Sequence, residues 1–174
     1  MKFSTRARYG LRMMVELARC LEKEPLVNLK QIAKITKISD NYLAQLAISL
    51  KNHGLVLGIS GKKGGYRLAR PANEITIGEV IQAVSGPLTI TECVNHPDIC
   101  LNSSFCEARA IWVLINDSVV QVMNRYSLAQ LINKNWLSDI KQRHTEIQLL
   151  NPDVVMAENS DEYLLGCPGY TAEN

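Results

Sequence analysis

The fold is decided by residues 28–68, which read NLKQIAKITKISDNYLAQLAISLKNHGLVLGISGKKGGYRL. Within this stretch Asn28 is a preferred helix N-cap, and Gln31 stands three residues later, where it can complete a capping box. Ser39 is a second N-cap, and Asp40 follows it at the positive end of the helix dipole. The pattern predicts two short helices joined by a tight turn, which is the helix-turn-helix motif.

The second of these helices is followed by a change of period. Its apolar stripe has the spacing i, i+3, i+4 and i+7 and consists of Leu43, Leu46, Ala47 and Leu50. His53 and Gly54 end the helix. Two β-type runs come next, at residues 55–59 and 65–69, and the turn-forming residues 60–64 join them. A hairpin directly behind a helix-turn-helix is a wing.

Further helices are predicted on both sides of this stretch. Residues 9–21 repeat apolar side chains every four residues, and Pro25 marks the break that follows. Thr76 and Glu79 form a capping box that opens a helix ending near residue 86. Residues 87–106 have no regular period and are predicted as a long irregular loop.

A long helix is predicted from Glu107 to about Tyr126, and a shorter one, capped by Ser127, over residues 128–136. The long helix is apolar over more than one face, so we expect part of it to pack against a second copy of the chain. The expected fold class is mainly α, a winged helix-turn-helix with a small β-hairpin wing and a long C-terminal dimerisation helix.

The chain is accordingly divided into four segments. Residues 1–86 form a DNA-binding head, and residues 87–106 form a cysteine-bearing loop. Residues 107–136 form the dimerisation helices, and residues 137–174 form an acidic extension that we expect to be flexible.

Charge divides the chain into halves of opposite sign. Residues 1–70 hold 14 Lys and Arg against four Asp and Glu, a net charge of +10, whereas residues 71–174 hold five against 13, a net charge of −8. The basic half favours a polyanionic partner such as nucleic acid.

No apolar run approaches the roughly 18 residues that cross a bilayer, and no export signal is recognised. We therefore expect a cytoplasmic protein with no membrane partner. Signatures of serine hydrolases, P-loop enzymes and dinucleotide-binding enzymes are absent, so no enzyme activity is expected.

The second helix of a helix-turn-helix places its N-terminal residues in the major groove of DNA. The residues expected there are Ser39, Asp40, Asn41, Tyr42 and Gln45. Asn and Gln can bond to both N6 and N7 of adenine, and Ser and Tyr can reach bases or phosphates. Lys51 and the wing-tip residues Lys62 and Lys63 would neutralise phosphates. The structural alternatives are an N-cap role for Ser39, core packing for Tyr42 and solvated loop charge for the wing lysines.

Several motifs resemble one known family. They are Met1-Lys2-Phe3-Ser4-Thr5, Arg8-Tyr9-Gly10-Leu11, Tyr42-Leu43-Ala44-Gln45-Leu46, Gly54-Leu55-Val56 and Gly61-Lys62-Lys63-Gly64-Gly65-Tyr66-Arg67-Leu68. Residues 1 to about 135 are similar to the Rrf family of winged-helix transcription regulators, which includes the IscR, NsrR and CymR types. The resemblance implies a homodimer held by the long helix that binds an inverted-repeat operator in double-stranded DNA. Ala44 and Ser60 stand where the IscR type carries glutamate and arginine, so no operator sequence is implied.

Three cysteines, Cys93, Cys100 and Cys106, lie within 14 residues of the predicted loop. Six residues separate the first pair and five the second, whereas structural zinc sites normally place roughly two to four residues between paired ligands. Iron–sulfur clusters accept thiolates at looser spacing. The residues alone leave two interpretations open, which are cluster ligands and buried or redox-labile thiols.

The resemblance implies a cluster, because cluster-binding members of the family carry three cysteines in this loop and CymR-type members lack them. Arg109 stands where the IscR type has a ligand histidine, and Arg8 stands where the NsrR type has a ligand aspartate. The local substitutes for the fourth ligand are His96, Asp98 and Glu107; we favour His96 because imidazole suits iron, and its alternative is an exposed loop histidine. The implied cofactor is a [2Fe-2S] or [4Fe-4S] cluster held by Cys93, Cys100 and Cys106.

These observations predict a DNA-binding transcriptional regulator, expected to be a repressor, whose operator binding is controlled by an iron–sulfur cluster that senses cluster status, redox state or nitric oxide. Because the loop joins the winged head to the long helix, the cluster would adjust the spacing of the two heads. The alternative is a cluster-free, CymR-like regulator that responds to thiol chemistry or to a small ligand.

Overall fold

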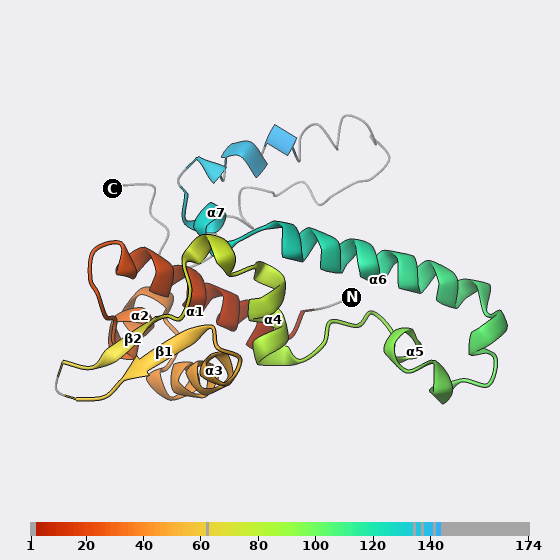
Figure 1. The fold of residues 1–174 in the computed structure, drawn as a ribbon, viewed down its shortest axis with the longest axis horizontal. Coiled ribbons are helices and arrows are strands. Elements are labelled where there is room, and N and C mark those ends of the chain that lie inside the picture. The colour runs from red at the N-terminus through yellow and green to blue at the C-terminus, as the bar shows by residue number, and fades with distance from the viewer. Residues whose placement is uncertain (1–2, 62, 134, 137, 141, 144–174) are drawn as a thin grey trace.

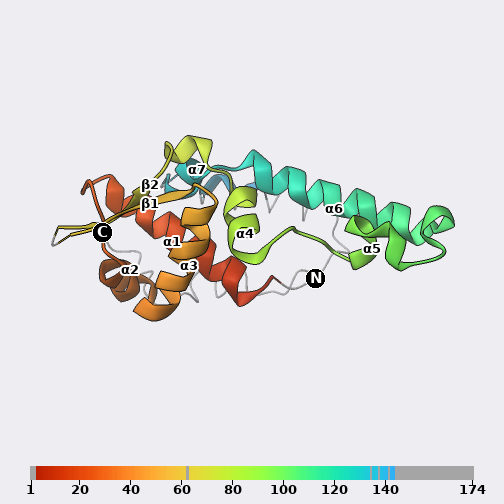
Figure 2. The same cartoon turned by 60° about the horizontal axis from the view of Figure 1, so that its bottom comes forward.

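The computed structural model describes residues 3–61, 63–133, 135–136, 138–140 and 142–143. Its elements follow in the order α1 (Thr5–Leu21), α2 (Leu29–Thr36), α3 (Asp40–Asn52), β1 (Val56–Ile59), β2 (Gly65–Leu68), η1 (Ala72–Glu74), α4 (Ile77–Ser85), α5 (Glu92–Asn95), η2 (Pro97–Ile99), η3 (Ser103–Phe105), α6 (Glu107–Arg125) and α7 (Leu128–Ile132). Over these described residues, a mainly helical fold with one two-stranded hairpin is confirmed. Figures 1 and 2 show a head built from α1 to α4, the hairpin and α7, from which α6 projects with α5 beside its far end.

Side-chain caps begin the helices of the head at the predicted residues. The hydroxyl of Ser39 accepts the backbone N–H of Tyr42 at 3.4 Å at the start of α3. Thr76 and Glu79 form the complete capping box at the start of α4. These caps satisfy backbone N–H groups that the first turn of a helix leaves without partners.

The capping box expected at the start of α2 is only half formed. Asn28 accepts the backbone N–H of Gln31 at 2.9 Å, as predicted. The side-chain amide of Gln31 donates instead to the two carboxylate oxygens of Glu24, at 3.0 and 3.1 Å. In a complete box the side-chain oxygen of Gln31 would accept the backbone N–H of Asn28. Here the side chain is turned toward the carboxylate of Glu24, with which its amide makes charge-assisted hydrogen bonds.

The turn between α2 and α3 has a defined geometry. Lys37 adopts the left-handed conformation, with φ of 58°, and ends α2. The hydroxyl of buried Thr36 donates to the carbonyl of Ile32 at 2.8 Å and accepts the N–H of Ile38 at 3.4 Å. Ile38 is itself buried in the core. The relative orientation of α2 and α3 is thus set by both backbone and side-chain contacts.

The wing is an antiparallel hairpin that is fastened at its base. Val56 of β1 lies opposite Leu68 of β2. Val27, just before α2, exchanges two backbone hydrogen bonds with Tyr66, of 3.0 and 2.8 Å. Gly65 permits this approach, because a Cβ at that position would lie 2.8 Å from the carbonyl oxygen of Val27. The wing is therefore tied to the segment that leads into the helix-turn-helix.

One hydrophobic core joins all the elements of the head. Its fully buried side chains include Met13, Met14, Leu17, Ile32, Leu43, Leu46, Leu50, Leu55, Val56, Val80 and Leu128. Leu128 belongs to α7, so the chain returns to the head after α6. Arg6 connects α1 with two other helices, since its Nε donates to the carbonyl of Val84 at 2.7 Å and its terminal nitrogen donates to the hydroxyl of Ser49 at 3.0 Å.

The sequence predicted an irregular loop over residues 87–106. In the structure this segment contains the single-turn helices α5, η2 and η3. A single turn has no apolar period to detect. The segment runs outward beside α6 before the chain reverses (Figure 1), and α5 contacts α6. The helix α7 ends at Ile132, earlier than the expected residue 136.

Some expectations fall on residues that are not described. Lys62 and residues 144–174, which make up most of the predicted acidic extension, lie outside the described residues. Over the part of the chain that is described, no helix combines the length and the apolar character needed to span a membrane.

Candidate DNA-binding face and cysteine-bearing segment

One face of α3 is open to solvent, opposite the buried stripe that contains Leu43 and Leu50. The exposed residues of this helix are Asp40, Asn41, Gln45, Ile48, Lys51 and Asn52. Within the described part of the chain, the side-chain amides of Asn41 and Gln45 have no hydrogen-bond partner. Two hydrogen-bonding groups are thus available to an outside partner, and their contact with DNA stays a prediction.

Two other predicted contact residues have structural roles. Ser39 is exposed, and its hydroxyl caps α3. Tyr42 is half-buried, and its ring meets that of Tyr9 edge-on, with the ring centres 5.9 Å apart and the planes at 86°. These are the structural alternatives that the sequence left open; a contact of either residue with DNA stays a prediction.

Basic residues lie on and beside the wing. Lys51, in the last turn of α3, lines a shallow hollow of about 170 Å³ together with Gly58, Ile59, Ser60, Gly65 and Tyr66 of the hairpin and its turn. Lys63 is exposed in that turn. Arg67 of β2 is also exposed, although the sequence prediction did not include it. The signal was the alternation of side chains along a strand, which turns Arg67 away from the face that Tyr66 and Leu68 pack against the core.

The three cysteines of the segment 93–106 differ in their surroundings. Cys93 lies in α5 and is half-buried, with its sulfur 3.3 Å from the hydroxyl of Thr91. Cys106 is half-buried at the N-cap position of α6, and Cys100 is exposed. Arg109, in the first turn of α6, donates from Nε to the carbonyl of Cys93 at 2.8 Å. The guanidinium of Arg109 therefore holds the backbone of the first cysteine.

A second contact from α6 holds the linker, residues 87–92, which precedes Cys93. Asn116 is buried, with 6% of its surface exposed, and its side-chain oxygen accepts the N–H of Ile90 at 3.2 Å. Sequence reasoning missed both Arg109 and Asn116. A polar residue among the apolar positions of α6 was the available signal for Asn116, because buried polar groups are almost always hydrogen-bonded.

The thiols do not converge on one point. Among the described residues, no three side chains of His, Cys, Asp or Glu lie close enough together to share a metal ion. His96 is exposed at the end of α5. The assignment of Cys93, Cys100 and Cys106 as ligands, with His96 as a fourth, stays a prediction.

Cys20, in α1, belongs to a different environment. It is partly buried against the core of the head. Burial raises the pKa of its thiol, and the nearby carboxylates of Glu16 and Glu24 raise it further. A raised pKa keeps this sulfur protonated and unreactive at neutral pH.

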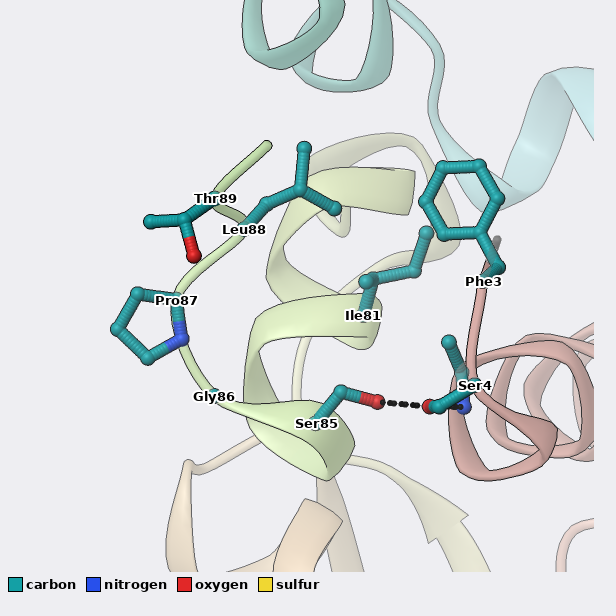
Figure 3. Close-up of a pocket in the computed structure, with 9 residues that line it drawn as sticks. Phe3, Ser4, Ile81, Ser85, Gly86, Pro87, Leu88 and Thr89 are labelled. Carbon is teal, nitrogen blue, oxygen red and sulfur yellow. Dashed lines mark hydrogen bonds between the residues drawn. The ribbon is translucent and has the colours of Figure 1, made fainter. Parts of the chain in front are cut away.

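A small hollow of about 130 Å³ lies where the linker leaves the head (Figure 3). It is lined by Phe3, Ser4, Ala7, Ile81, Ser85, Gly86, Pro87, Leu88 and Thr89. The hydroxyls of Ser4 and Ser85 are hydrogen-bonded at 3.0 Å, joining the start of α1 to the end of α4. Figure 3 shows Leu88 and Phe3 on either side of Ile81. The linker therefore leaves the head beside an apolar surface.

The long helix α6 has two unlike faces. Val113, Asn116, Val120 and Met123 are buried or half-buried. The opposite face exposes large apolar side chains, namely Ile111 (56% exposed), Leu114 (63%), Ile115 (39%) and Val122 (55%), with Trp112 (40%) beside them. An exposed apolar face of this size is typical of an interaction surface.

The helix-turn-helix, its wing, the unpaired amides on α3 and the neighbouring basic residues define a winged-helix DNA-binding module. Comparison with known proteins makes the assignment specific. Residues 3–134 match the Rrf2 family model, which is described as an iron-dependent transcriptional regulator. The chain belongs to the Rrf2 family of transcriptional regulators.

Its relatives include proteins of two types. CymR of Bacillus subtilis is 37% identical over 131 residues, which are 75% of this chain and 89% of CymR. The structure of that protein, the global cysteine regulator of B. subtilis, matches with a TM-score of 0.65 and 36% identity over 76% of this chain and 96% of its own. IscR of Cronobacter sakazakii is 33% identical over 147 residues, 84% of this chain and 90% of IscR. The structure of T. potens IscR matches with a TM-score of 0.60 and 28% identity over 95% of this chain and 96% of its own. The named relatives are transcriptional regulators and not enzymes, in agreement with the prediction from sequence.

Proposed function

We propose that this Rrf2 family regulator binds an inverted-repeat operator as a homodimer, and that an iron–sulfur cluster on residues 93–106 controls that binding. The observation that carries the cluster is the placement of three cysteines on the segment that leads from the winged head into α6. A ligand on such a segment acts on the connection between the DNA-binding module and the proposed dimer helix.

The exposed apolar face of α6 supports the homodimer. A second copy of the same helix would cover Ile111, Ile115 and Val122, which the single chain leaves open to water. A two-fold dimer presents two α3 helices, and an operator with two half-sites must match their separation, at about 34–36 Å for half-sites one turn apart. Any change in the angle between head and α6 therefore changes the fit to the operator.

The donor set fits an iron–sulfur cluster chemically, because thiolates are its usual ligands. Cys93, Cys100 and Cys106 would hold the cluster, and His96 is the candidate for a fourth ligand. When bound, the cluster would supply a centre that oxidants and reductants can alter. Since the thiols do not converge as the segment stands, ligation requires residues 97–105 to rearrange.

Two side chains of α6 would transmit such a rearrangement. Arg109 holds the carbonyl of Cys93, and Asn116 holds the N–H of Ile90, so the linker and α6 move together while these hydrogen bonds persist. A tenfold change in operator affinity corresponds to only about 1.4 kcal/mol. That is about the net contribution of one hydrogen bond, so a small rearrangement of the segment is sufficient.

The test is a comparison of loaded and apo protein, purified and reconstituted without oxygen. We expect visible absorption, iron and sulfide in the reconstituted protein, and an operator affinity at least tenfold different from that of apo protein. Cys100→Ala should lose the iron and behave as apo protein, whereas Cys20→Ala, the matched control outside the segment, should keep it. Equal affinities of loaded and apo protein on more than one operator would contradict control by a cluster and leave DNA binding intact.

The second candidate is a cluster-free regulator of the CymR kind, controlled by thiol chemistry. It is favoured by the separation of the three thiols, by the exposure of Cys100 and by the similarity to CymR. Protein that stays colourless after anaerobic reconstitution, and releases its operator when Cys100 is oxidised or alkylated, would support this candidate over the cluster.

A further inference from the structure

An apolar side chain lies in the middle of the exposed face of α3. Ile48 is 61% exposed, although it belongs to a helix whose other large aliphatic side chains are buried. It stands three residues after Gln45, four after Ala44 and seven after Asn41. Residues at these spacings share one face of a helix. Asn41, Ala44, Gln45 and Ile48 thus form a single row that we name the α3 row.

The spacing of the α3 row is the one by which a helix reads a major groove. In homeodomains, the recognition helix contacts base edges through four residues at i, i+3, i+4 and i+7. Asn41, Ala44, Gln45 and Ile48 have this same spacing. All four are exposed or half-exposed on α3. Ile48 therefore lies on the same exposed face of α3 as Asn41 and Gln45, about two turns after Asn41.

The chemistry of the row favours adenine and thymine. Asn and Gln bond bidentately to N6 and N7 of adenine, and small apolar groups contact the C5-methyl group of thymine. Guanine is read mainly by Arg or Lys, and the only cationic residue of α3 is Lys51, which lines the hollow beside the wing. Asp40 is exposed at the first residue of α3, one turn before Ala44, and so lies at the N-terminal end of the row.

We propose that Ile48 packs on a thymine methyl group and determines operator specificity, with Ala44 extending the apolar contact and Asn41 and Gln45 reading adenines. The base pairs under the α3 row in each half-site are then A·T. This inference rests on the proposed function, because it requires α3 to enter the major groove. An exposed isoleucine over a G·C pair would leave polar base edges covered by a side chain that cannot pair with them.

The methyl group can be removed from the DNA without changing any hydrogen bond. An operator is first selected from randomised duplexes with the full-length protein, both as purified without oxygen and after reconstitution. Each thymine of one half-site is then replaced by deoxyuridine. The affinities of wild type, Ile48→Ala and Ile35→Ala are measured on every duplex; Ile35 is an exposed isoleucine of α2, 42% exposed, and is the matched control.

We expect selected half-sites with adjacent A·T pairs, and one thymine whose replacement weakens wild-type binding about fourfold, the effect of one buried methyl group. Ile48→Ala should bind the thymine duplex about fourfold more weakly than wild type does. Its affinity should not fall further when that thymine is replaced by deoxyuridine. Ile35→Ala should behave as wild type. Thermal unfolding of the two variants confirms that both are folded.

Two results would overturn the inference. One is a deoxyuridine effect that persists unchanged in Ile48→Ala, and the other is a selected half-site with G·C pairs at its centre. Binding to random duplex at low salt distinguishes a failure of the inference about Ile48 from a failure of the proposed DNA-binding function. Protein that binds random duplex without a methyl effect refutes the role of Ile48 alone, whereas protein that binds no duplex at all refutes the proposed function as well.

Discussion

Replacement of Gly10 by alanine should destabilise the head, against the ordinary preference of helices for alanine. Gly10 lies in the interior of α1, where alanine normally gains about 0.5–1 kcal/mol over glycine. A Cβ at this position would lie 2.8 and 3.0 Å from the two terminal carbons of Val84, which is buried in α4. Overpacking of a core costs about 1–3 kcal/mol. The overpacking exceeds the gain, so we expect a net loss of about 1 kcal/mol and a Tm lower by about 2–4 °C.

A double-mutant cycle isolates this contact. Urea unfolding is measured for wild type, Gly10→Ala, Val84→Ala and the double variant. Val84→Ala removes the two carbons that the new methyl group would meet. In that background Gly10→Ala should stabilise the head by about 0.5–1 kcal/mol, its ordinary helix preference. An equal cost of Gly10→Ala in both backgrounds, or a gain in the wild-type background, would refute the steric reasoning.

Three further predictions concern acid stability, thiol reactivity and assembly. Burial tends to raise the pKa of Glu79, but hydrogen bonds from Thr76 and the ion pair with Arg70 outweigh it, so its pKa lies below the ordinary value. A lowered pKa stabilises the folded state above about pH 4.3, and that stability is lost as the pH falls through the folded-state pKa. The free energy of unfolding should therefore differ less between pH 7 and pH 3 in Glu79→Gln than in wild type. An unchanged difference would contradict this. In reduced apo protein, iodoacetamide at neutral pH should modify exposed Cys100 before Cys20, because the pKa of Cys20 is raised by burial and by neighbouring carboxylates. Mass spectrometry follows the order in which the two cysteines are modified. Equal rates of modification would refute this prediction. Ile115→Glu should convert a dimer to monomers in sedimentation experiments because it places a charge in the apolar face of α6, and a dimer that persists would exclude that face as the interface.

The local elements were predictable because their signals lie within a few residues of one another. Ser39 and Thr76 cap their helices in the structure as their sequence contexts indicate. The hairpin forms where the period changes from helical to alternating, and Gly54 ends α3 in the left-handed region with φ of 67°. Caps, turns and periodicity depend on bonds that span three or four residues, so they can be recognised without knowledge of the fold.

The contacts of single polar side chains were not predictable to the same degree. Gln31 has the right position for a capping box, yet it bonds to Glu24, seven residues earlier. Arg6 is one of the many basic residues of the N-terminal half, and only the structure shows that it bonds to the carbonyl of Val84 and the hydroxyl of Ser49. A long side chain can form hydrogen bonds with any acceptor that the tertiary fold brings within reach, and sequence spacing does not show which acceptor is nearest.

The sequence by itself determined the family, the helix-turn-helix, the wing and the presence of three thiols in one short segment, because each of these is a property of neighbouring residues. Only the tertiary structure decided that Ile48 is exposed beside Asn41 and Gln45, that one face of α6 is left open, and that Cys93 is held to α6 by Arg109. It also decided that Cys93, Cys100 and Cys106 stand apart. Burial and the distance between residues far apart in the chain depend on how the helices pack, and no local pattern specifies that packing.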